Sequence, residues 1–381
     1  MRSVSLLVTL FVALFSPGLL AAPDLVPAPP QLSATASLLI DHHSGRVLVE
    51  HNANTRVEPA SITKIMTSYV AFHALRNGSI KLDDEVRISE NARYKHTDGS
   101  RMFVEYNSLV SVEDLLRGVI IQSGNDASIA LAEHIAGSEE SFANLMNRHA
   151  RALGMQDSHF TNSTGWPDEN HYTTAADLAK LARAMINDFP EEYAMFSERR
   201  FTHNDIQQSN RNRLLWLDDR VDGIKTGYTE SADYCLVSSA QNDSMRLIAV
   251  VMGATGPEQR DEDSRKLLNY GFRFYETFAL HDANEPLTEM RIWKGAQEMV
   301  PLGLQAPLHI TIPRGQRRNV KAHMKVDSMI MAPAQKGQEY GTVNVTLGEE
   351  QLVSKPLVAL RDVEEGGLWR KLIDSITLLF K

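Results

Sequence analysis

The sequence predicts an α/β domain, in which a largely antiparallel sheet is flanked by helices, followed by a small all-β domain and a terminal amphipathic helix. Strand patterns come first and last in the first domain, with helical patterns between them, so its sheet is expected to form from both ends of the domain. After about Leu280, short apolar runs between Gly and Pro turns replace the helical period and indicate the all-β domain. We expect the first domain to span residues 31–282, the second 283–365 and the helix 366–381.

Size and charge are those of a soluble globular protein. The chain has 381 residues, of which 43% are hydrophobic and 23% charged, so two domains can each bury a core. The net charge of −9 and the lack of a long basic block argue against a nucleic-acid partner. Cys235 is the only cysteine, so no internal disulfide can form. Its apolar neighbours suggest a small buried side chain on a strand.

Residues 1–22 have the pattern of a secretory signal peptide. Arg2 gives a positive start, an apolar run follows, and Ala21-Ala22 supplies the small residues of a cleavage site. The alternative is an N-terminal membrane anchor, but the apolar run is shorter than the ~20 residues that a spanning helix needs. We therefore expect an exported protein.

The elements of the first domain follow from its periodicity. Strands are expected at 37–41 and 46–50, a helix at 60–75, helices within 112–189 around a polar loop at 161–174, strands at 224–229, 234–239 and 245–252, and a last helix at 261–278. Asp177 is expected to cap the helix that begins near Leu178.

The second domain and the tail differ from the first in pattern. Strand-like runs occur at 299–302, 308–312, 320–326, 342–347 and 352–360. In the tail, Leu368, Trp369, Ile373 and Phe380 fall with other apolar residues on one face of a helix, and polar residues fall on the other. This pattern favours a helix that lies in a membrane interface and is too short to span a bilayer, with docking on the protein's own surface as the alternative.

Three short motifs occur in an order that indicates covalent catalysis by a serine. They are Ser61-Ile62-Thr63-Lys64, Ser123-Gly124-Asn125 and Lys225-Thr226-Gly227. The first is the only Ser-x-x-Lys in the chain and the third is the only Lys-Thr-Gly, whereas Ser89-Glu90-Asn91 also fits the loose form of the second.

The first motif can activate a hydroxyl. A serine is a poor nucleophile unless a base takes its proton, and a spacing of three places Ser61 and Lys64 on one face of a helix. The positive end of that helix favours an alkoxide and a neutral amine. A lysine desolvated near a second cation can act as the base, and Lys225 would be that cation.

The third motif suits a peptide with a free carboxylate. A strand edge can pair with an extended peptide, and Gly227 lets the two backbones approach closely. Lys225 and Thr226 offer a cation and a hydroxyl to a terminal carboxylate. An oxyanion hole would be formed by backbone N–H groups, which these side-chain patterns do not identify.

Residues 58–67 (EPASITKIMT) and 221–229 (VDGIKTGYT) closely resemble the low-molecular-mass penicillin-binding proteins that are serine-type D-alanyl-D-alanine carboxypeptidases. The resemblance covers the whole mature chain, including the β domain and the tail. It implies a β-lactamase/transpeptidase-like first domain that removes the terminal D-Ala from peptidoglycan pentapeptides. It also implies β-lactams as covalent inhibitors, and a location on the periplasmic face of the bacterial inner membrane.

The resemblance also implies roles for individual residues. Ser61 becomes the nucleophile, Lys64 the general base and Ser123 a proton relay. The remaining roles concern substrate binding: Asn125 donates to the substrate amide, Lys225, Thr226 and Arg211 bind the carboxylate beside Gly227, and the backbone N–H groups of Ser61 and Tyr228 form the oxyanion hole.

Two positions depart from the family pattern. Tyr228 stands where relatives often have His, and Asp233 stands where Gly is common. Neither change removes a catalytic group, but each is expected to affect substrate preference or deacylation rate.

Other functions remain as alternatives at this point. A class A β-lactamase would share the motifs and need a glutamate such as Glu169, although such enzymes do not usually carry a β domain and a membrane tail. A DD-endopeptidase or a non-catalytic peptidoglycan-binding scaffold is also conceivable. The 13 His residues include no His-Glu-x-x-His, so zinc peptidase chemistry fits poorly and no metal or cofactor is expected.

Overall fold

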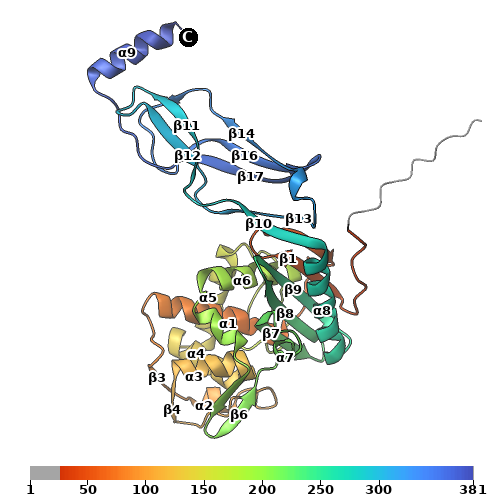
Figure 1. Cartoon of the computed structure of the whole chain (residues 1–381). Coiled ribbons are helices and arrows are strands. Elements are labelled where there is room, and N and C mark those ends of the chain that lie inside the picture. The colour runs from red at the N-terminus through yellow and green to blue at the C-terminus, as the bar shows by residue number, and fades with distance from the viewer. Residues whose placement is uncertain (1–25, 381) are drawn as a thin grey trace, which may run out of the picture.

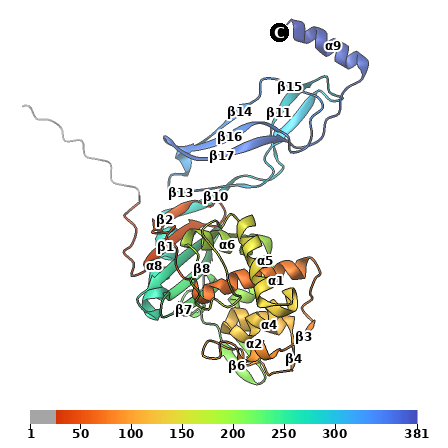
Figure 2. The ribbon, with the colours of Figure 1, turned by 180° about the vertical axis from the view of Figure 1, so that it is seen from behind.

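The computed structural model describes residues 26–380, so the predicted signal peptide at 1–22 lies outside the described residues. The protein is elongated: a helix-rich domain forms one end, a β domain follows, and the last helix projects from the far end of the β domain (Figure 1; Figure 2). The predicted fold class, an α/β domain followed by an all-β domain and a terminal helix, is confirmed.

The first domain is built on a five-stranded sheet of order β2-β1-β9-β8-β7, in which every neighbouring pair is antiparallel. The strands are β1 (Ala36–Asp41), β2 (Val47–His51), β7 (Val221–Thr229), β8 (Asp233–Asn242) and β9 (Met245–Ala254). The two N-terminal strands join the sheet through β9, as the positions of the strand patterns at both ends of the domain predicted. The edge strand β7 carries the third motif.

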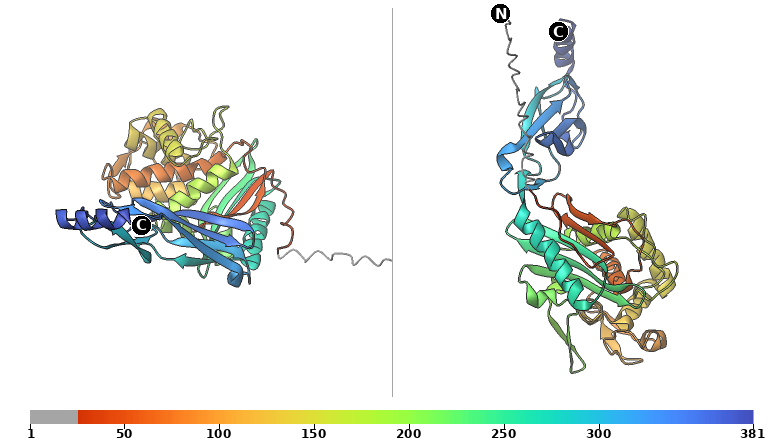
Figure 3. Two further views of the ribbon diagram at one scale, coloured as in Figure 1. Left: turned by 90° about the horizontal axis from the view of Figure 1, so that it is seen from above. Right: turned by 90° about the vertical axis from the view of Figure 1, so that its right-hand side faces the viewer.

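Helices cover both faces of this sheet (Figure 3). On one face pack α1 (Lys64–Arg76), α3 (Val112–Arg117), α4 (Asn125–Ala136), α5 (Glu139–Ala152) and α6 (Ala175–Asp188). On the other face packs α8 (Pro257–Phe274), so the sheet is buried between two apolar cores.

Short elements complete the first domain. They are η1 (Ala60–Thr63), η2 (Gly118–Gln122), η3 (Glu192–Ser197), α2 (Glu90–Tyr94), α7 (Leu214–Leu217), and the strand pairs β3 (Glu85–Arg87) with β4 (Leu109–Ser111) and β5 (Arg200–His203) with β6 (Ile206–Ser209). The strand pairs are only three or four residues long, which is too short for a period to be recognised in the sequence.

Two sequence predictions about helix ends were wrong. The last helix was expected at 261–278, but α8 ends at Phe274 and the chain continues as β10 (Tyr275–His281). This strand is held by antiparallel pairing with β13 (Leu308–Pro313), a long-range contact that overrides the local helical pattern. Asp177 does not cap α6: the Thr174 side chain accepts from the Asp177 N–H, so Thr174 is the cap.

The β domain has one core between its sheets. A six-stranded sheet of order β14-β16-β17-β12-β11-β15 packs with the β10–β13 pair. Its strands are β11 (Pro286–Trp293), β12 (Met299–Gly303), β14 (Val320–Val326), β15 (Ile330–Met331), β16 (Glu339–Leu347) and β17 (Glu350–Ala359), and η4 (Arg317–Asn319) precedes β14.

Hydrogen bonds join the two domains where β10 and β13 meet the β1–β2 turn. The Ser44 and Thr311 hydroxyls lie 2.6 Å apart, and Thr277 Oγ1 donates to the buried Asp41 carboxylate at 2.7 Å. Arg46 Nη1 donates to the Thr311 carbonyl oxygen at 2.9 Å. The connection is therefore polar as well as covalent.

The terminal helix α9 (Leu368–Leu379) is attached through its polar face. Asp374 is buried; its carboxylate accepts from the Lys294 N–H at 2.6 Å and from Arg291 at 3.1 Å. The apolar face is turned outward, with Leu368 87%, Trp369 79% and Phe380 88% exposed. In the described part of the chain, no helix has the length and apolar content to cross a membrane.

Candidate active site

Ser61 lies in a turn of 3-10 helix, η1, that runs directly into α1. The sequence predicted one helix from residue 60, and the structure instead puts Ser61 in this tighter turn and Lys64 at the first position of α1. Ala60 has φ 46°, a left-handed conformation that is strained for a residue with a side chain. Gly165 packs against this turn so closely that a Cβ on it would meet the Ala60 carbonyl oxygen at 1.8 Å. The turn is thus packed closely against the loop that contains Gly165.

Lys64 is the most deeply buried charged group of the site, with 0% exposure. Its Nζ lies 3.1 Å from Ser61 Oγ, 2.8 Å from Asn125 Oδ1 and 2.7 Å from the Thr164 carbonyl oxygen. An ammonium can donate to all three acceptors. After loss of one proton, two donors remain for Asn125 and Thr164, and the lone pair can face the Ser61 hydroxyl.

Ser123 and Asn125, of the second motif, line the same cleft as Ser61, and Asn125 contacts Lys64. Ser123 follows the π-helical turn η2 and has φ 66°, and Asn125 begins α4. Both are at least nine-tenths buried, and Ser123 Oγ has no hydrogen-bond partner within residues 26–380. Asp126 fixes the backbone here, because its carboxylate accepts from the N–H groups of Met102 and Phe103.

The third motif lies in the middle of β7, where Lys225 pairs with Val237 of β8 and Thr226 with Leu236. Lys225 is 2% exposed, and its Nζ donates to the Thr226 carbonyl oxygen at 3.2 Å. Thr226, Gly227 and Tyr228 line the same cleft as Ser61, Ser123 and Asn125. The three motifs, separated by up to about 160 residues of sequence, are therefore brought to one place.

Gly227 lets β7 contact the turn that carries Ser61. A Cβ at this position would lie 3.1 Å from the Pro59 carbonyl oxygen and 3.2 Å from the Ile62 nitrogen. This close approach places the backbone of Tyr228 beside that of Ser61. The Tyr228 side chain is 51% exposed at the rim, with its ring centroid 4.5 Å from that of Tyr234.

The cleft has a volume of about 1440 Å³, and arginine side chains line part of it. Arg211 is exposed and lines it, and within the described residues its guanidinium forms no ion pair. Its backbone N–H donates to the Ile121 carbonyl oxygen, which ties the segment to η2. Arg260 also lines the cleft, but it is paired with Asp261 at 2.7 Å.

Positive charges on Lys64 and Lys225 are unfavourable, because both side chains are buried and the two charges repel each other. Burial lowers the pKa of Lys64 to about 7, although the carboxylates of Asp126 and Glu139 act in the opposite direction. Burial also lowers the pKa of Lys225 well below its usual value, and the positive charges of Lys64 and Arg211 add to this effect. A substrate carboxylate beside Lys225 would restore its charge and leave Lys64 as the group that gives up a proton.

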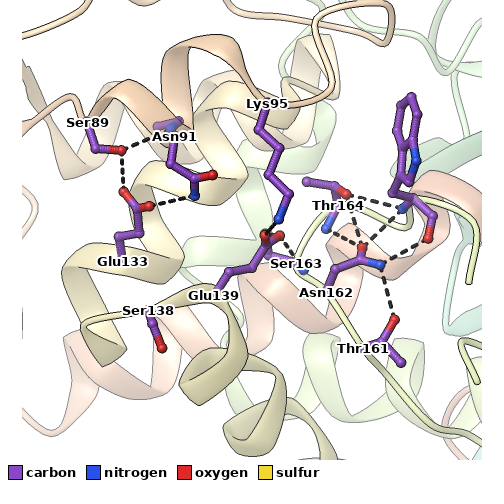
Figure 4. A network of polar contacts seen from close by, with 12 residues as sticks. Ser89, Asn91, Lys95, Glu133, Ser138, Glu139, Thr161, Asn162, Ser163 and Thr164 are labelled. Atoms are coloured by element: carbon purple, nitrogen blue, oxygen red, sulfur yellow. Dashed lines mark hydrogen bonds and ion pairs between the residues drawn. The ribbon is translucent and has the colours of Figure 1, made fainter.

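A polar network that sequence reasoning missed positions the Thr164 carbonyl (Figure 4). The Asn162 side-chain oxygen accepts from the backbone N–H groups of Thr164, Gly165 and Trp166 at 2.8–3.1 Å. The adjacent Ser163 N–H and hydroxyl donate to the buried Glu139 carboxylate, which also pairs with Lys95 at 2.6 Å. The only sequence signal was an Asn three residues before a Gly, which is typical of a turn.

The structure also places the other residues that the sequence analysis singled out. Glu169 is exposed and does not line the cleft. Asp233, the first residue of β8, has φ 53°, a left-handed conformation that Asp and Gly tolerate better than most residues. In the described part of the chain, no group of three or more His, Cys, Asp or Glu side chains is placed to hold a metal ion.

Comparison with known proteins agrees with this geometry. The family model described as D-alanyl-D-alanine carboxypeptidase matches residues 24–256, and that of the penicillin-binding protein 5 C-terminal domain matches residues 275–365. The D-alanyl-D-alanine carboxypeptidases DacC and DacA of Escherichia coli (strain K12) are 44% and 41% identical, over 97% and 93% of this chain and 94% and 90% of their own lengths. A crystal structure of penicillin binding protein 5 from Haemophilus influenzae is 43% identical and superposes with a TM-score of 0.85, covering 89% of this chain and all of that one.

The charge of Glu139 should set the pH at which Lys64 becomes a base. Glu139→Gln removes a negative charge that favours the Lys64 ammonium, so the pKa of Lys64 should fall further. The rising limb of the rate of acylation by penicillin against pH should move to lower pH by roughly 0.5–1 unit.

The matched control is Glu133→Gln, whose carboxylate accepts from Ser89 and Asn91 in the same group of helices (Figure 4). It should leave the limb unchanged. An equal shift in both variants, or none in Glu139→Gln, would contradict this role of Glu139.

Proposed function

Since the chain belongs to the D-alanyl-D-alanine carboxypeptidase family of serine hydrolases, we propose that it removes the terminal D-Ala of peptidoglycan stem peptides through an acyl-enzyme on Ser61. The observation that carries the assignment of residues is the contact between a buried lysine and the serine, Lys64 Nζ to Ser61 Oγ at 3.1 Å. A buried amine with a lowered pKa beside a hydroxyl is the arrangement that a serine nucleophile requires.

Acylation begins when Lys64 takes the Ser61 proton and Ser61 Oγ attacks the carbonyl carbon of the penultimate D-Ala. The backbone N–H groups of Ser61 and Tyr228 hold the resulting oxyanion. The proton that Lys64 has taken passes through Ser123 Oγ to the nitrogen of the leaving D-Ala as the C–N bond breaks, which returns Lys64 to the neutral amine. Support for Ser123 comes from its burial in the wall of the cleft that holds Ser61 and from its hydroxyl, which has no hydrogen-bond partner within the described residues.

Deacylation repeats the steps with water. Lys64 takes a proton from the water as the water oxygen attacks the ester carbon. Lys64 then returns this proton to Ser61 Oγ, which leaves as the ester C–O bond breaks. The enzyme is restored, and the shortened peptide leaves with a new terminal carboxylate. Asn125 would donate its amide N–H to the substrate backbone, because its oxygen is already bound by Lys64 at 2.8 Å.

The free carboxylate of the substrate would be bound by Lys225, Thr226 and Arg211. This role is supported by two features: Lys225 has no carboxylate partner within the described residues, and the Arg211 guanidinium forms no ion pair there. An unpaired buried cation is costly unless a ligand supplies the counter-charge. The peptide would extend along the edge of β7, as in other strand-addition complexes.

β-Lactams are proposed as covalent inhibitors that acylate Ser61, in keeping with the names of the penicillin-binding relatives. A β-lactamase is not favoured, because Glu169 is exposed outside the cleft. The endopeptidase and scaffold alternatives are not favoured either, since the relatives that match the full chain are carboxypeptidases.

We further propose that the enzyme is exported and sits on the periplasmic face of the inner membrane, held by α9. The support is the orientation of α9: its polar face is bound to the β domain through Asp374, and Leu368, Trp369 and Phe380 are exposed. A helix that served the protein's own core would bury its apolar face instead.

Replacing the nucleophile tests the chemistry directly. Ser61→Ala should give no covalent adduct with penicillin in intact-mass analysis, because no oxygen is left to form the ester. Ser231→Ala, at the rim of the same cleft, should still be labelled. Undiminished labelling of Ser61→Ala would exclude Ser61 as the nucleophile.

Replacing Lys225 tests carboxylate binding. Lys225→Met should lower kcat/KM for a D-Ala-D-Ala peptide with a free carboxylate by about 30-fold or more, since a buried charge pair contributes about 2–5 kcal/mol. The same peptide with an amidated end should be affected much less. An equal loss on both peptides would count against this role.

Charges on the outer face of α9 test membrane attachment. The double variant Trp369→Glu, Phe380→Glu should reduce binding to vesicles that contain anionic lipid by at least about tenfold, since burying one aromatic side chain contributes about 1.5–3 kcal/mol. Met324→Glu, at an exposed apolar position of β14, is the control. Unchanged binding of the double variant would rule out this anchor, and penicillin labelling of all variants would show that they fold.

A further inference from the structure

We propose that a second cleft, at the joint between the two domains, binds a phosphate-like oxyanion that bridges the catalytic domain and the β domain. This cleft has a volume of about 800 Å³ and shares no lining residue with the Ser61 cleft. One wall is the β1–β2 turn with α6, and the other is β13, β17 and the segment that precedes β13. The joint lies between the two lobes seen in Figure 1.

Two cations of this cleft have no counter-charge. Arg183 Nε and Nη2 donate to the backbone carbonyl oxygens of His42 and His43 at 2.7 and 3.0 Å, which fixes the guanidinium without neutralising it. Lys355, on the opposite wall, is exposed. Neither cation forms an ion pair with a described carboxylate. The two charges come from different domains and line one cleft, so an anion held by both would bridge the domains.

The carboxylates near the cleft are already bound. Glu350 pairs with Arg46 at 2.7 Å, so the two charges cancel. The Asp41 carboxylate accepts from Ser44 N–H and from the Ser44 and Thr277 hydroxyls and is fully buried. Arg246, farther along β9, pairs with an aspartate of β7. The cleft therefore keeps a net positive charge from Arg183 and Lys355.

Imidazoles complete the site. The rings of His43 and His309 stack across the joint, with centroids 4.8 Å apart and an angle of 23° between planes. His42 lies behind them, 5% exposed, and within the described residues its Nδ1 has no hydrogen-bond partner. Two stacked imidazoles can donate to one oxyanion when protonated, and an anion would offset their mutual repulsion.

The chemistry favours a tetrahedral dianion. A fixed guanidinium, an ammonium and two imidazoles match the several oxygens of phosphate or sulfate. The remaining wall includes Pro307, Leu352 and Pro356, which could contact an organic group attached to the phosphate. The ion could thus be free phosphate or the phosphodiester of a lipid headgroup, and the two share the group that is recognised.

Sulfate is the appropriate probe, because its charge stays constant over the pH range in which histidines titrate. Calorimetric titration of the full chain with sulfate at pH 6.5, against sodium chloride at equal ionic strength, should show saturable binding to one site. Lys355→Gln should weaken it at least roughly threefold, as expected for an exposed charge. Lys321→Gln, an exposed lysine of β14 outside the cleft, should not.

The pH dependence tests the imidazoles. Burial lowers the pKa of His42 to about 3, so His42 stays neutral. Burial also lowers the pKa of His43, with Arg183 and Arg246 acting in the same direction and the Asp41 carboxylate in the opposite one, so His43 gains its charge only at acidic pH. Sulfate should therefore bind more tightly at pH 5.5 than at pH 7.5, and His43→Asn should abolish most of that difference. Absence of saturable binding, or equal weakening by Lys355→Gln and Lys321→Gln, would overturn the proposal.

Competition identifies the natural source. Inorganic phosphate and glycerophosphoglycerol, a soluble lipid headgroup, should both displace sulfate. Tighter binding of glycerophosphoglycerol would assign the site to a lipid headgroup, and tighter binding of inorganic phosphate would assign it to the free ion. Failure of both to displace sulfate would also overturn the proposal. Penicillin labelling of Ser61, which does not involve this cleft, confirms that each variant is folded.

Discussion

The burial of the Lys64 ammonium against Ser61 is the constraint on which the rest of the site depends. A buried lysine is costly unless its donors are satisfied or its proton is lost. Three acceptors surround Nζ at 2.7–3.1 Å, and one of them is Ser61, the proposed nucleophile. The same desolvation that makes the ammonium unstable therefore makes the neutral amine an available base. Catalysis and the local cost in stability have one cause.

This arrangement needs elements from the whole first domain. The turn η1 supplies Ser61, α4 supplies Asn125, and the loop before α6 supplies the Thr164 carbonyl. Gly165 and Gly227 allow these segments to approach to distances that a side chain would prevent. The antiparallel sheet fixes β7 beside η1, so Thr226 lines the same cleft as Ser61. The β domain contributes no residue to it.

The sequence predicted the features that depend on period and motif. The layered fold, the sheet built from strands at both ends of the first domain and the family were all confirmed. Features set by long-range contacts were not predictable. Residues 275–278 look helical but pair with β13, and a local pattern does not contain that partner. The Thr164 carbonyl is a backbone group, so no side-chain motif marks it, and its orientation depends on Asn162 and on the distant Glu139.

The central claim is that Lys64 can lose its proton near neutral pH, and its own titration tests this most directly. The full chain, labelled with ¹⁵N in lysine side chains, would be titrated by NMR, with Lys64→Arg used to assign the signal. An Nζ signal that titrates near pH 7 is the expected result. A Lys64 ammonium that remains protonated up to the ordinary lysine range, above about pH 10, would contradict the account.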